Sequence, residues 1–382
     1  MHNSLFTMEY PSLANEKTTD ILRLIRSENV GPVTFFKLLS YFGSVSKALD
    51  AIPDMAKRGG RAKPIKIASI AAVKEEIEKT EAFGAKIIVY GSPDYPKMLH
   101  TIHDAPPVIF TLGRSNVWQK GINIGIVGAR NASANGCRLT QKIASDLGKS
   151  DICVISGLAR GIDAAAHSGA IDTGTVGVIA GGINTIYPSE NTYLYDKMRD
   201  VGGIISHQPF GFEPLASSFP ARNRIISGMS HGVLVVEASL RSGSLITARQ
   251  ALDQNREIFA IPGSPMDPRC KGTNQLLRDG AALTESAQDI IQQMQHLKNA
   301  PLSEPNNTEF QPSAIAIPSE SELEKARKLI VGKLSHDPVL VDELITQCQV
   351  TAGVVMTVLL EMELAGRINR HPGNRVSLRF ES

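Results

Sequence analysis

The sequence lacks the features that mark secreted, membrane-spanning and metal-binding proteins. Its four cysteines are scattered without a CxxC pair, which argues against a zinc site or a disulfide framework and indicates a reducing compartment. No apolar run reaches the roughly 18 residues that a membrane span requires. The N-terminus shows no charged segment followed by an apolar one, so we expect no signal peptide and a cytoplasmic protein.

An excess of one charge is also lacking, because 40 Lys and Arg residues nearly balance 38 Asp and Glu residues and leave a net charge of only +2. A histone-like attraction of the whole surface to nucleic acid is therefore excluded, whereas a local basic cleft is not. The sequence has no HExxH motif, no carboxylate cluster suited to Mg²⁺ and no nucleophile elbow. These absences favour binding over catalysis, and we assign no catalytic residue, no metal and no cofactor.

What the sequence does contain is a long region, residues 86–297, in which apolar β-rich runs alternate with helical patterns. Near-continuous apolar strands joined by helical crossovers are typical of a parallel sheet covered on both faces. We therefore predict an α/β fold with a doubly wound, Rossmann-like parallel sheet. The predicted strands are 86–90, 122–128, 151–157, 175–182, 202–207, 232–238 and 256–263.

The flanking segments show helical spacing instead. Apolar residues on both sides of "NVGP" indicate an αα-hairpin, and "KRGGRAKPIK" at 57–66 is expected to be a solvated loop, with an extension of a DNA track as the alternative. Three helical patterns followed by "RINRHPGNRVSLRF" indicate a winged helix near the C-terminus. The predicted organisation is a loose tail at 1–17, a helical domain at 18–85, the Rossmann-like domain at 86–297, a Pro- and Ser-rich linker at 298–320 and a winged helix at 321–382.

Polar clusters follow several of the predicted strands, at the edge of an open α/β sheet where ligands bind. The turn Gly128–Gly136 is neither a dinucleotide fingerprint nor a P-loop, and Arg130 either points from it into a cleft or is a plain surface arginine. In Ser156–His167, glycines permit close backbone approach and a helix N-terminus favours anions. Tyr187 either stacks on a ligand or packs in the core.

The stretch "FPARNRIISG", 219–228, carries the strongest signal. Arg222 and Arg224 are predicted to lie at the start of a helix, where cations oppose the helix dipole. Their placement makes sense if an anion occupies that end, because a guanidinium group donates two parallel hydrogen bonds to phosphate. Phe219, just before them, offers a ring on which a base can stack.

Several anion-friendly helix starts and arginines at one sheet edge indicate a polyanionic ligand, and sparse aromatic residues among them are typical of single-stranded nucleic acid binding. A further helix start, Ser242–Ser244, fits this pattern, although simple N-capping explains it as well. The residues assigned to the candidate DNA site are Arg130, Ser156, Gly157, Arg160, Gly161, Gly182, Tyr187, Phe219, Arg222, Asn223, Arg224, Ser242, Gly243 and Ser244.

These motifs resemble one known family. "IGIVGARNASANG", "ISGLARGIDAAAHSGAI" and "FPARNRIISGMSHGVLVVEASLRSGSLITARQA" are similar to the DprA (DNA-processing protein A, or Smf) family, over roughly residues 90–285. The flanks resemble its N-terminal SAM-like, helix-hairpin-helix-type domain and its optional winged-helix module.

The resemblance implies a homodimer without established catalytic activity. It implies that this homodimer binds single-stranded DNA in a pocket of the Rossmann domain, hands incoming strands to the recombinase RecA during natural transformation, and helps load RecA onto strands coated by single-strand-binding protein. On this sequence the pocket maps to Arg130, the "SGLARG" turn and "FPARNR", so Arg222 and Arg224 are expected to face phosphates.

Two departures accompany the resemblance. His207 stands where the family often has Glu, and the winged-helix segment is neutral, with eight Lys or Arg and eight Asp or Glu over 321–382. The segment that corresponds to a recognition helix, "AGVVMTVLLEMELAG", has no basic residue. We therefore expect this module to make protein contacts, or only weak duplex contacts through Arg370 and Arg375.

Two alternatives remain beside the single-strand mediator. One is a nucleotide phosphoribohydrolase-like enzyme, in which Glu237 or His167 would act as acid or base while Arg222 holds the phosphate. The other is a scaffold that serves mainly dimer and recombinase contacts, with DNA binding incidental.

Overall fold

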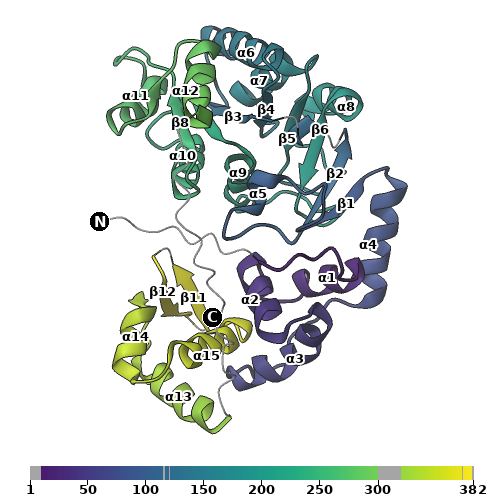
Figure 1. Cartoon of the computed structure of the whole chain (residues 1–382), viewed down its shortest axis with the longest axis vertical. Helices are drawn as coiled ribbons and strands as arrows, with labels where there is room; N and C mark the ends of the chain where they lie inside the picture. Colours follow the sequence, from purple (N-terminus) through teal and green to yellow (C-terminus); the bar gives the residue numbers. More distant parts are fainter. Residues whose placement is uncertain (1–9, 115–116, 120, 300–319, 372, 381–382) are drawn as a thin grey trace. The chain divides into compact units, whose positions relative to one another are not determined.

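The computed structural model describes residues 10–114, 117–119, 121–299, 320–371 and 373–380. The chain forms two compact units, each built from separate segments (Figure 1). The central unit comprises Met1–Asn15 and Lys74–Pro301, and the terminal unit comprises Glu16–Val73 and Leu302–Ser382. Helix α4 (Ile70–Ala82) runs across the boundary between them.

The central unit is built on a nine-stranded sheet with the order β1-β2-β6-β5-β4-β3-β7-β8-β9. The strands from β6 to β9 in this order are all parallel, which confirms a Rossmann-like, mostly parallel sheet. The strands are β1 (Lys86–Val89), β2 (Val108–Gly113), β3 (Asn123–Gly128), β4 (Cys153–Ser156), β5 (Thr175–Val178), β6 (Gly203–Ser206), β7 (Gly232–Val236), β8 (Glu257–Ala260) and β9 (Ala282–Leu283).

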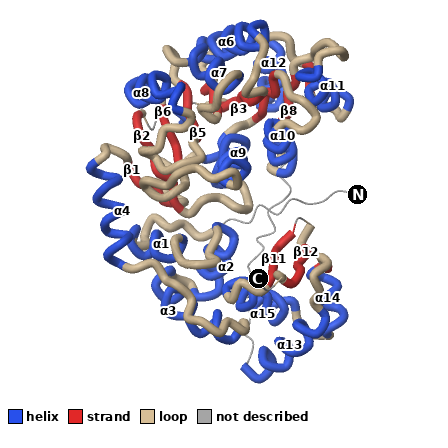
Figure 2. The backbone as a smooth tube through the Cα atoms, turned by 180° about the vertical axis from the view of Figure 1, so that it is seen from behind, coloured by secondary structure: helices blue, strands red, loops and turns tan. Residues whose placement is uncertain are grey.

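Helices cover both faces of this sheet because its strands are apolar on both sides (Figures 1 and 2). Helices α6, α7 and α12 share one core cluster with β3, β4 and β7. Helices α9 and α10 lie on the other face. The helices are α5 (Lys97–His100), α6 (Ala134–Lys149), α7 (Ile162–Ala170), α8 (Thr192–Val201), α9 (Ser218–Met229), α10 (Gly243–Asp253), α11 (Lys271–Arg278) and α12 (Ala287–Asn299), with 3₁₀ turns at Val117–Gln119, Ser189–Asn191 and Pro268–Cys270.

Two expectations about this unit were wrong. The first predicted strand is not parallel to the sheet, because β1 pairs antiparallel with β2, a strand that was not predicted, and β2 pairs antiparallel with β6. The tail is not loose over residues 10–17. Leu13 is fully buried and its N–H donates to the carbonyl of Tyr90 at 3.0 Å, while the Tyr10 hydroxyl donates to the carbonyl of His103. Residues 1–9 of the predicted tail lie outside the described residues.

The terminal unit combines the N-terminal helices with the winged-helix module. The predicted break at "NVGP" is present, because Asn29 adopts a left-handed conformation and Pro32 begins the next helix. The segments are α1 (Thr18–Ile25), α2 (Pro32–Phe42), α3 (Val45–Arg58), α13 (Glu320–Lys333), β10 (Val339–Leu340), α14 (Val341–Cys348), α15 (Ala352–Leu364), β11 (Ile368–His371) and β12 (Arg375–Leu378).

The winged-helix module has its own apolar core, formed by α13, α14, α15 and a three-stranded sheet with the order β10-β12-β11. Within the described residues no single helix is long and apolar enough to cross a membrane. Only α14 and α15 together reach that length and composition, and they are bent by 118° at their junction. Most of the predicted linker, 300–319, lies outside the described residues.

Candidate functional site

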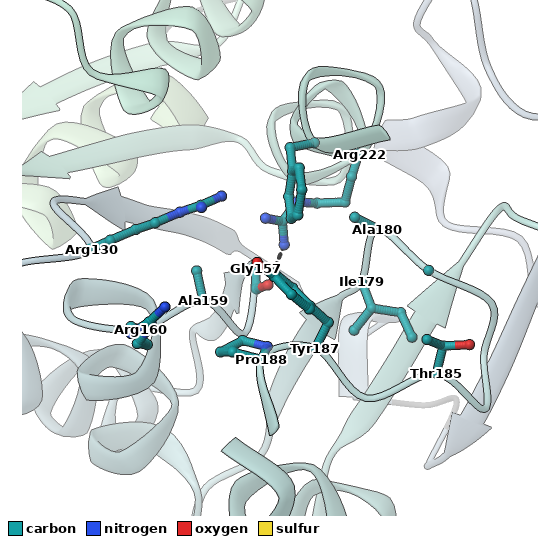
Figure 3. A pocket seen from close by; sticks show the side chains of 12 residues that line it. Arg130, Gly157, Ala159, Arg160, Ile179, Ala180, Thr185, Tyr187, Pro188 and Arg222 are labelled. Carbon is teal, nitrogen blue, oxygen red and sulfur yellow. Dashed lines mark hydrogen bonds between the residues drawn. The ribbon is translucent and has the colours of Figure 1, made fainter. Parts of the chain in front are cut away.

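An open pocket lies at the carboxyl ends of three neighbouring strands, β3, β4 and β5, and is closed from one side by helix α9 (Figure 3). The turns that follow these strands bring together residues that are far apart in the sequence. None of the lining residues is acidic. They are Arg130, Gly157, Ala159, Arg160, Ile179, Ala180, Gly181, Thr185, Tyr187, Pro188, Phe219 and Arg222.

The rim of the pocket carries aromatic rings and an exposed guanidinium group. The guanidinium carbon of Arg130 lies 4.9 Å from the ring centroid of Phe219, within the range of a cation–π contact. The ring of Tyr187 lies 5.6 Å from that of Phe219 at an interplanar angle of 53°, and Tyr187 is 49% exposed. Arg160 lies 3.4 Å from the carboxylate of Glu190, and both side chains are more than half exposed.

Arg222 forms part of the pocket wall and is almost fully buried, with 4% exposed. Its NH1 nitrogen donates to the carbonyls of Gly157 and of Val178, at the ends of β4 and β5, and its Nε donates to the side chain of Asn223 at 3.0 Å. Burial lowers the pKa of Arg222 to about 10, and neighbouring Arg130 contributes to this lowering. The side chain thus joins two strand ends and keeps its charge at neutral pH.

The wall behind Arg222 holds two further titratable groups. Asp163 is buried in the first turn of α7, and burial raises its pKa while the Arg222 charge opposes that rise. His167 is fully buried, and its Nδ1 lies 2.9 Å from the hydroxyl of Thr175. Burial, with help from the positive charge of Arg222, lowers the pKa of His167 to about 3. His167 therefore stays neutral inside the domain and packs there.

Glycine is required at the two turns that shape the pocket floor. A Cβ added to Gly157 would lie 2.1 Å from NH1 of Arg222, so no larger residue fits beneath that guanidinium group. Gly161 has a φ of +75°, and an added Cβ would lie 2.3 Å from the carbonyl oxygen of Ala129. These contacts hold the turns after β3 and β4 close together.

Within "FPARNR", Phe219 and Arg222 line the pocket, and their contact with DNA stays a prediction, whereas the predicted helix start was wrong. Helix α9 begins at Ser218, so both arginines lie beyond its first turn, and the argument from the helix dipole does not apply. Arg224 does not line the pocket. It bonds to the carbonyl of Asp104 and lies 3.3 Å from the carboxylate of the same residue. Residues two positions apart on a helix point in different directions, and for this reason the side chains of Arg222 and Arg224 have different surroundings.

The other assigned residues do not line the pocket. Ser156 is buried and donates to the carbonyl of Ile126, and Gly182 lies against the backbone of Pro209. Ser242 caps α10, its hydroxyl accepting from the Ser244 N–H at 3.3 Å, so the simple N-capping interpretation accounts for Ser242–Ser244. Six lining residues were not predicted individually, and three of them, residues 179–181, fall inside the predicted strand 175–182 because β5 ends earlier, at Val178. The six are Ala159, Ile179, Ala180, Gly181, Thr185 and Pro188.

The acidic residue proposed for an enzyme lies outside the pocket lining. Glu237 accepts hydrogen bonds from both the N–H and the hydroxyl of Ser133, which caps α6. Within the described part of the chain, no group of three or more His, Cys, Asp or Glu side chains is placed to hold a metal ion.

Fold and pocket together define a Rossmann-like α/β protein with a candidate ligand pocket that is lined by guanidinium groups and aromatic rings. The DNA recombination-mediator protein A family matches residues 86–295, the DprA-like N-terminal HHH domain matches 15–78, and the DprA winged-helix domain matches 313–374. The chain belongs to this DprA, or Smf, family.

Similar proteins agree with this membership. DNA processing protein DprA of Bacillus subtilis is 42% identical over 58% of this chain and 75% of its own length. Protein Smf of Synechocystis is 30% identical over 96% of this chain and its own full length. The X-ray structure of DprA from Streptococcus pneumoniae superposes with a TM-score of 0.61 at 32% identity, covering 72% of this chain and 98% of that one.

A structure of DNA processing protein A from Helicobacter pylori also superposes, with a TM-score of 0.51 at 26% identity. It covers 55% of this chain and 95% of that one, and it was described together with the single-stranded DNA binding mode of that protein.

Proposed function

We propose that the pocket at the ends of β3, β4 and β5 binds single-stranded DNA, and that the protein is a recombination mediator. In this role it protects incoming strands during DNA uptake and loads a RecA-type recombinase onto them. We further propose that it acts as a homodimer in the cytoplasm and helps to load the recombinase onto strands coated by single-strand-binding protein. Family membership and the single-stranded DNA binding described for the Helicobacter relative support the proposal.

The observation that carries the proposal is the composition of the pocket. Three guanidinium groups, from Arg130, Arg160 and Arg222, line it without an acidic side chain among the lining residues. Positive groups beside ring faces are the combination that binds single strands with little sequence preference, because phosphates meet the cations and bases stack on the rings. The exposed ring of Tyr187 and the half-buried ring of Phe219 supply that second element.

The enzyme alternative loses its two candidate acid–base groups. His167 is buried and packed against Thr175, with a pKa of about 3, and it does not line the pocket. Glu237 is held by Ser133 outside the lining. A general base must come within hydrogen-bond reach of the proton that it removes, and neither group meets that requirement in this pocket.

The test is fluorescence anisotropy of a labelled oligothymidine at several salt concentrations. Replacing Arg130 by Ala is expected to weaken binding about 10-fold, a loss of about 1.4 kcal/mol. It should also make the log–log salt slope shallower by about 0.7, the value for one phosphate contact to a single strand. Arg199→Ala is the control. Arg199 is exposed, as Arg130 is, but it lies on α8 outside the pocket lining, where it pairs with acidic side chains.

Equal affinities and equal salt slopes for wild type and Arg130→Ala would mean that this pocket does not bind DNA. Competition with thymidine monophosphate separates the alternatives further. A mononucleotide that displaces the oligonucleotide at micromolar concentration would favour a small-molecule site.

Recombinase loading separates the mediator from the scaffold. The assay is the DNA-dependent ATP hydrolysis of RecA on strands coated with single-strand-binding protein. The proposal expects Arg130→Ala to lower the stimulation in proportion to its loss of DNA affinity. Full stimulation by a variant that no longer binds DNA would support the scaffold instead.

A further inference from the structure

Helix α15 occupies the position of a recognition helix in the winged-helix module, yet almost none of it is free. From Val354 to Leu364 its residues are buried or half-buried. One side of the helix packs into the module's own core. Leu360, Glu361 and Leu364 are also buried, with at most 3% exposed, but they do not belong to that core. They form a second buried face.

This second face packs against the N-terminal helical domain, and α3 and α15 run side by side in both views of the molecule (Figures 1 and 2). The carboxylate of Glu361 lies between two arginines, one from each domain. It accepts from Nε of Arg58 in α3 at 3.0 Å, and from Nε and NH2 of Arg327 in α13 at 2.7 and 2.9 Å. A buried carboxylate with such partners is stable only while both are present.

The backbones of the two domains also approach very closely. A Cβ added to Gly59, directly after α3, would lie 2.0 Å from the carbonyl oxygen of Glu361. Asn29 donates from its side chain to the carbonyl of Leu364 at 3.0 Å, at the end of α15 where helix carbonyls lack partners. Thr34 donates to the carboxylate of Glu363 at 2.7 Å. The contact therefore combines charge, hydrogen bonds and a glycine-dependent fit.

The chemistry of α15 suits a protein partner and not DNA. The helix has no Lys or Arg that could contact phosphates, and its acidic residues Glu361 and Glu363 are bonded to arginines of the same chain. Arg370 of the wing, which was expected to contact a duplex, donates to Glu363 at 2.9 Å. Arg58 and Gly59 lie in the segment that was expected to be a solvated loop, so the structure gives part of that segment a contact instead.

We propose that α15 is a protein-docking helix whose partner is the helical domain of its own chain, at the surface formed by α2, α3 and the loop between α1 and α2. The two ends of the chain then act as one body, and the winged helix does not read duplex DNA. This inference does not depend on what binds in the pocket of the central unit.

The experiment uses the full chain with an N-terminal affinity tag and a site-specific protease sequence inserted between residues 303 and 315. After cleavage, the protein is recovered through the tag, and the C-terminal fragment is sought in the recovered material. We expect more than nine-tenths of the fragment to be retained. Release of the wild-type fragment at micromolar concentration would overturn the proposal.

Arg58→Glu places a second carboxylate against Glu361 and is expected to release most of the fragment. Lys57→Glu makes the same charge change one residue away on an exposed side chain, and it should retain the fragment as wild type does. A second disrupting variant, Gly59→Val, tests the close backbone approach, and its control Gly31→Ala adds a methyl group where nothing lies within 4 Å. Retention in both disrupting variants would overturn the proposal.

Duplex binding gives an independent readout. Because α15 carries no basic residue, uncut Arg58→Glu is expected to bind a 30-base-pair duplex within twofold of Lys57→Glu. If uncut Arg58→Glu bound the duplex 10-fold or more tightly than Lys57→Glu, the contact would be masking a duplex-reading helix. The proposed docking role would then be wrong.

Discussion

Two arginines of the pocket and two arginines of the terminal unit have partners of different kinds. In the pocket of the central unit, Arg130 lies over a ring and Arg222 donates to backbone carbonyls, so neither charge is cancelled by a direct ion pair. In the terminal unit, Arg327 and Arg370 are each bonded to a carboxylate. A chain with a net charge of only +2 can thus carry a local site with three arginines and no acidic residue in its lining. Counting charges along the sequence does not reveal this difference.

Removal of Arg222 is expected to have the largest effect on the stability and on the DNA binding of the central unit. In Arg222→Met the buried carbonyls of Gly157 and Val178 lose their hydrogen-bond donor. Asp163 loses the positive charge that favours its carboxylate form. We expect the free energy of unfolding of the central unit to fall by about 3–5 kcal/mol. Single-stranded DNA binding should be lost as well. Urea unfolding can be followed through Trp118, the one tryptophan of the chain, which is buried in this unit.

Arg224→Met is the control for that experiment. It removes a half-buried arginine two residues away, which bonds to Asp104 and does not line the pocket. It should cost some stability, about 1–3 kcal/mol, while the folded protein keeps its DNA affinity. An equal loss of affinity in both variants would mean that the pocket is not where the strand binds.

The strand ends could be predicted from the sequence, because buried parallel strands followed by Gly-rich turns have few alternatives. That pattern predicts Arg130, the "SGLARG" turn and Tyr187 at one sheet edge, and all three contribute to the pocket lining. The division of labour between Arg222 and Arg224 was not predicted. It depends on where α9 begins, and element boundaries follow from tertiary packing more than from local sequence.

The positive charge of the pocket also acts on a buried base. The pKa of His167 is about 3 in the folded protein, against about 6.5 when unfolded, so the unfolded chain takes up a proton that the folded chain refuses. The stability tied to His167 is complete above pH 6.5 and is lost as the pH falls from 6.5 towards 3. We expect the central unit to lose about 2 kcal/mol between pH 7 and pH 5. His167→Gln should flatten this dependence in Trp118-monitored unfolding, and an unchanged slope would assign it to other groups.

Lys37 in α2 is a basic residue of the terminal unit with a lowered pKa, as His167 is in the central unit. Burial, with the charge of Arg370, lowers its pKa to about 8, although Glu363 favours the charged form. The unfolded lysine titrates near 10.4, so the folded state is penalised below pH 8 and gains stability as the pH rises from 8 to 10.4. Lys37→Met should therefore stabilise α2 by about 1 kcal/mol at pH 7 and by less at pH 10. Hydrogen exchange of α2 peptides measures both, and a gain independent of pH would reflect packing alone.

The docking of α15 was only partly foreseen. The lack of basic residues predicted protein contacts for the module, and the structure supplies a contact within the same chain. The partner could not be predicted, because Arg58 and Glu361 are about 300 positions apart and no local pattern links them. Long-range ion pairs of this kind become visible only once both domains are folded.

The smallest expected effect concerns an ion pair at the pocket, and it tests whether this pair lowers the affinity of the pocket for single-stranded DNA. Among the described pocket arginines, Arg160 is the one that forms an ion pair within 4 Å, with Glu190 at 3.4 Å, and both side chains are exposed. Glu190→Gln removes the negative charge and leaves the side-chain shape, so Arg160 becomes fully available to a phosphate. Since exposed pairs contribute about 0.2–1 kcal/mol, affinity for oligothymidine should rise about twofold at low salt, and the gain should fade as salt screens the interaction. A Glu190→Gln variant that binds no more tightly than wild type at low salt would mean that Arg160 does not contact the strand, and that Arg130 and Arg222 alone supply the positive charge of the site.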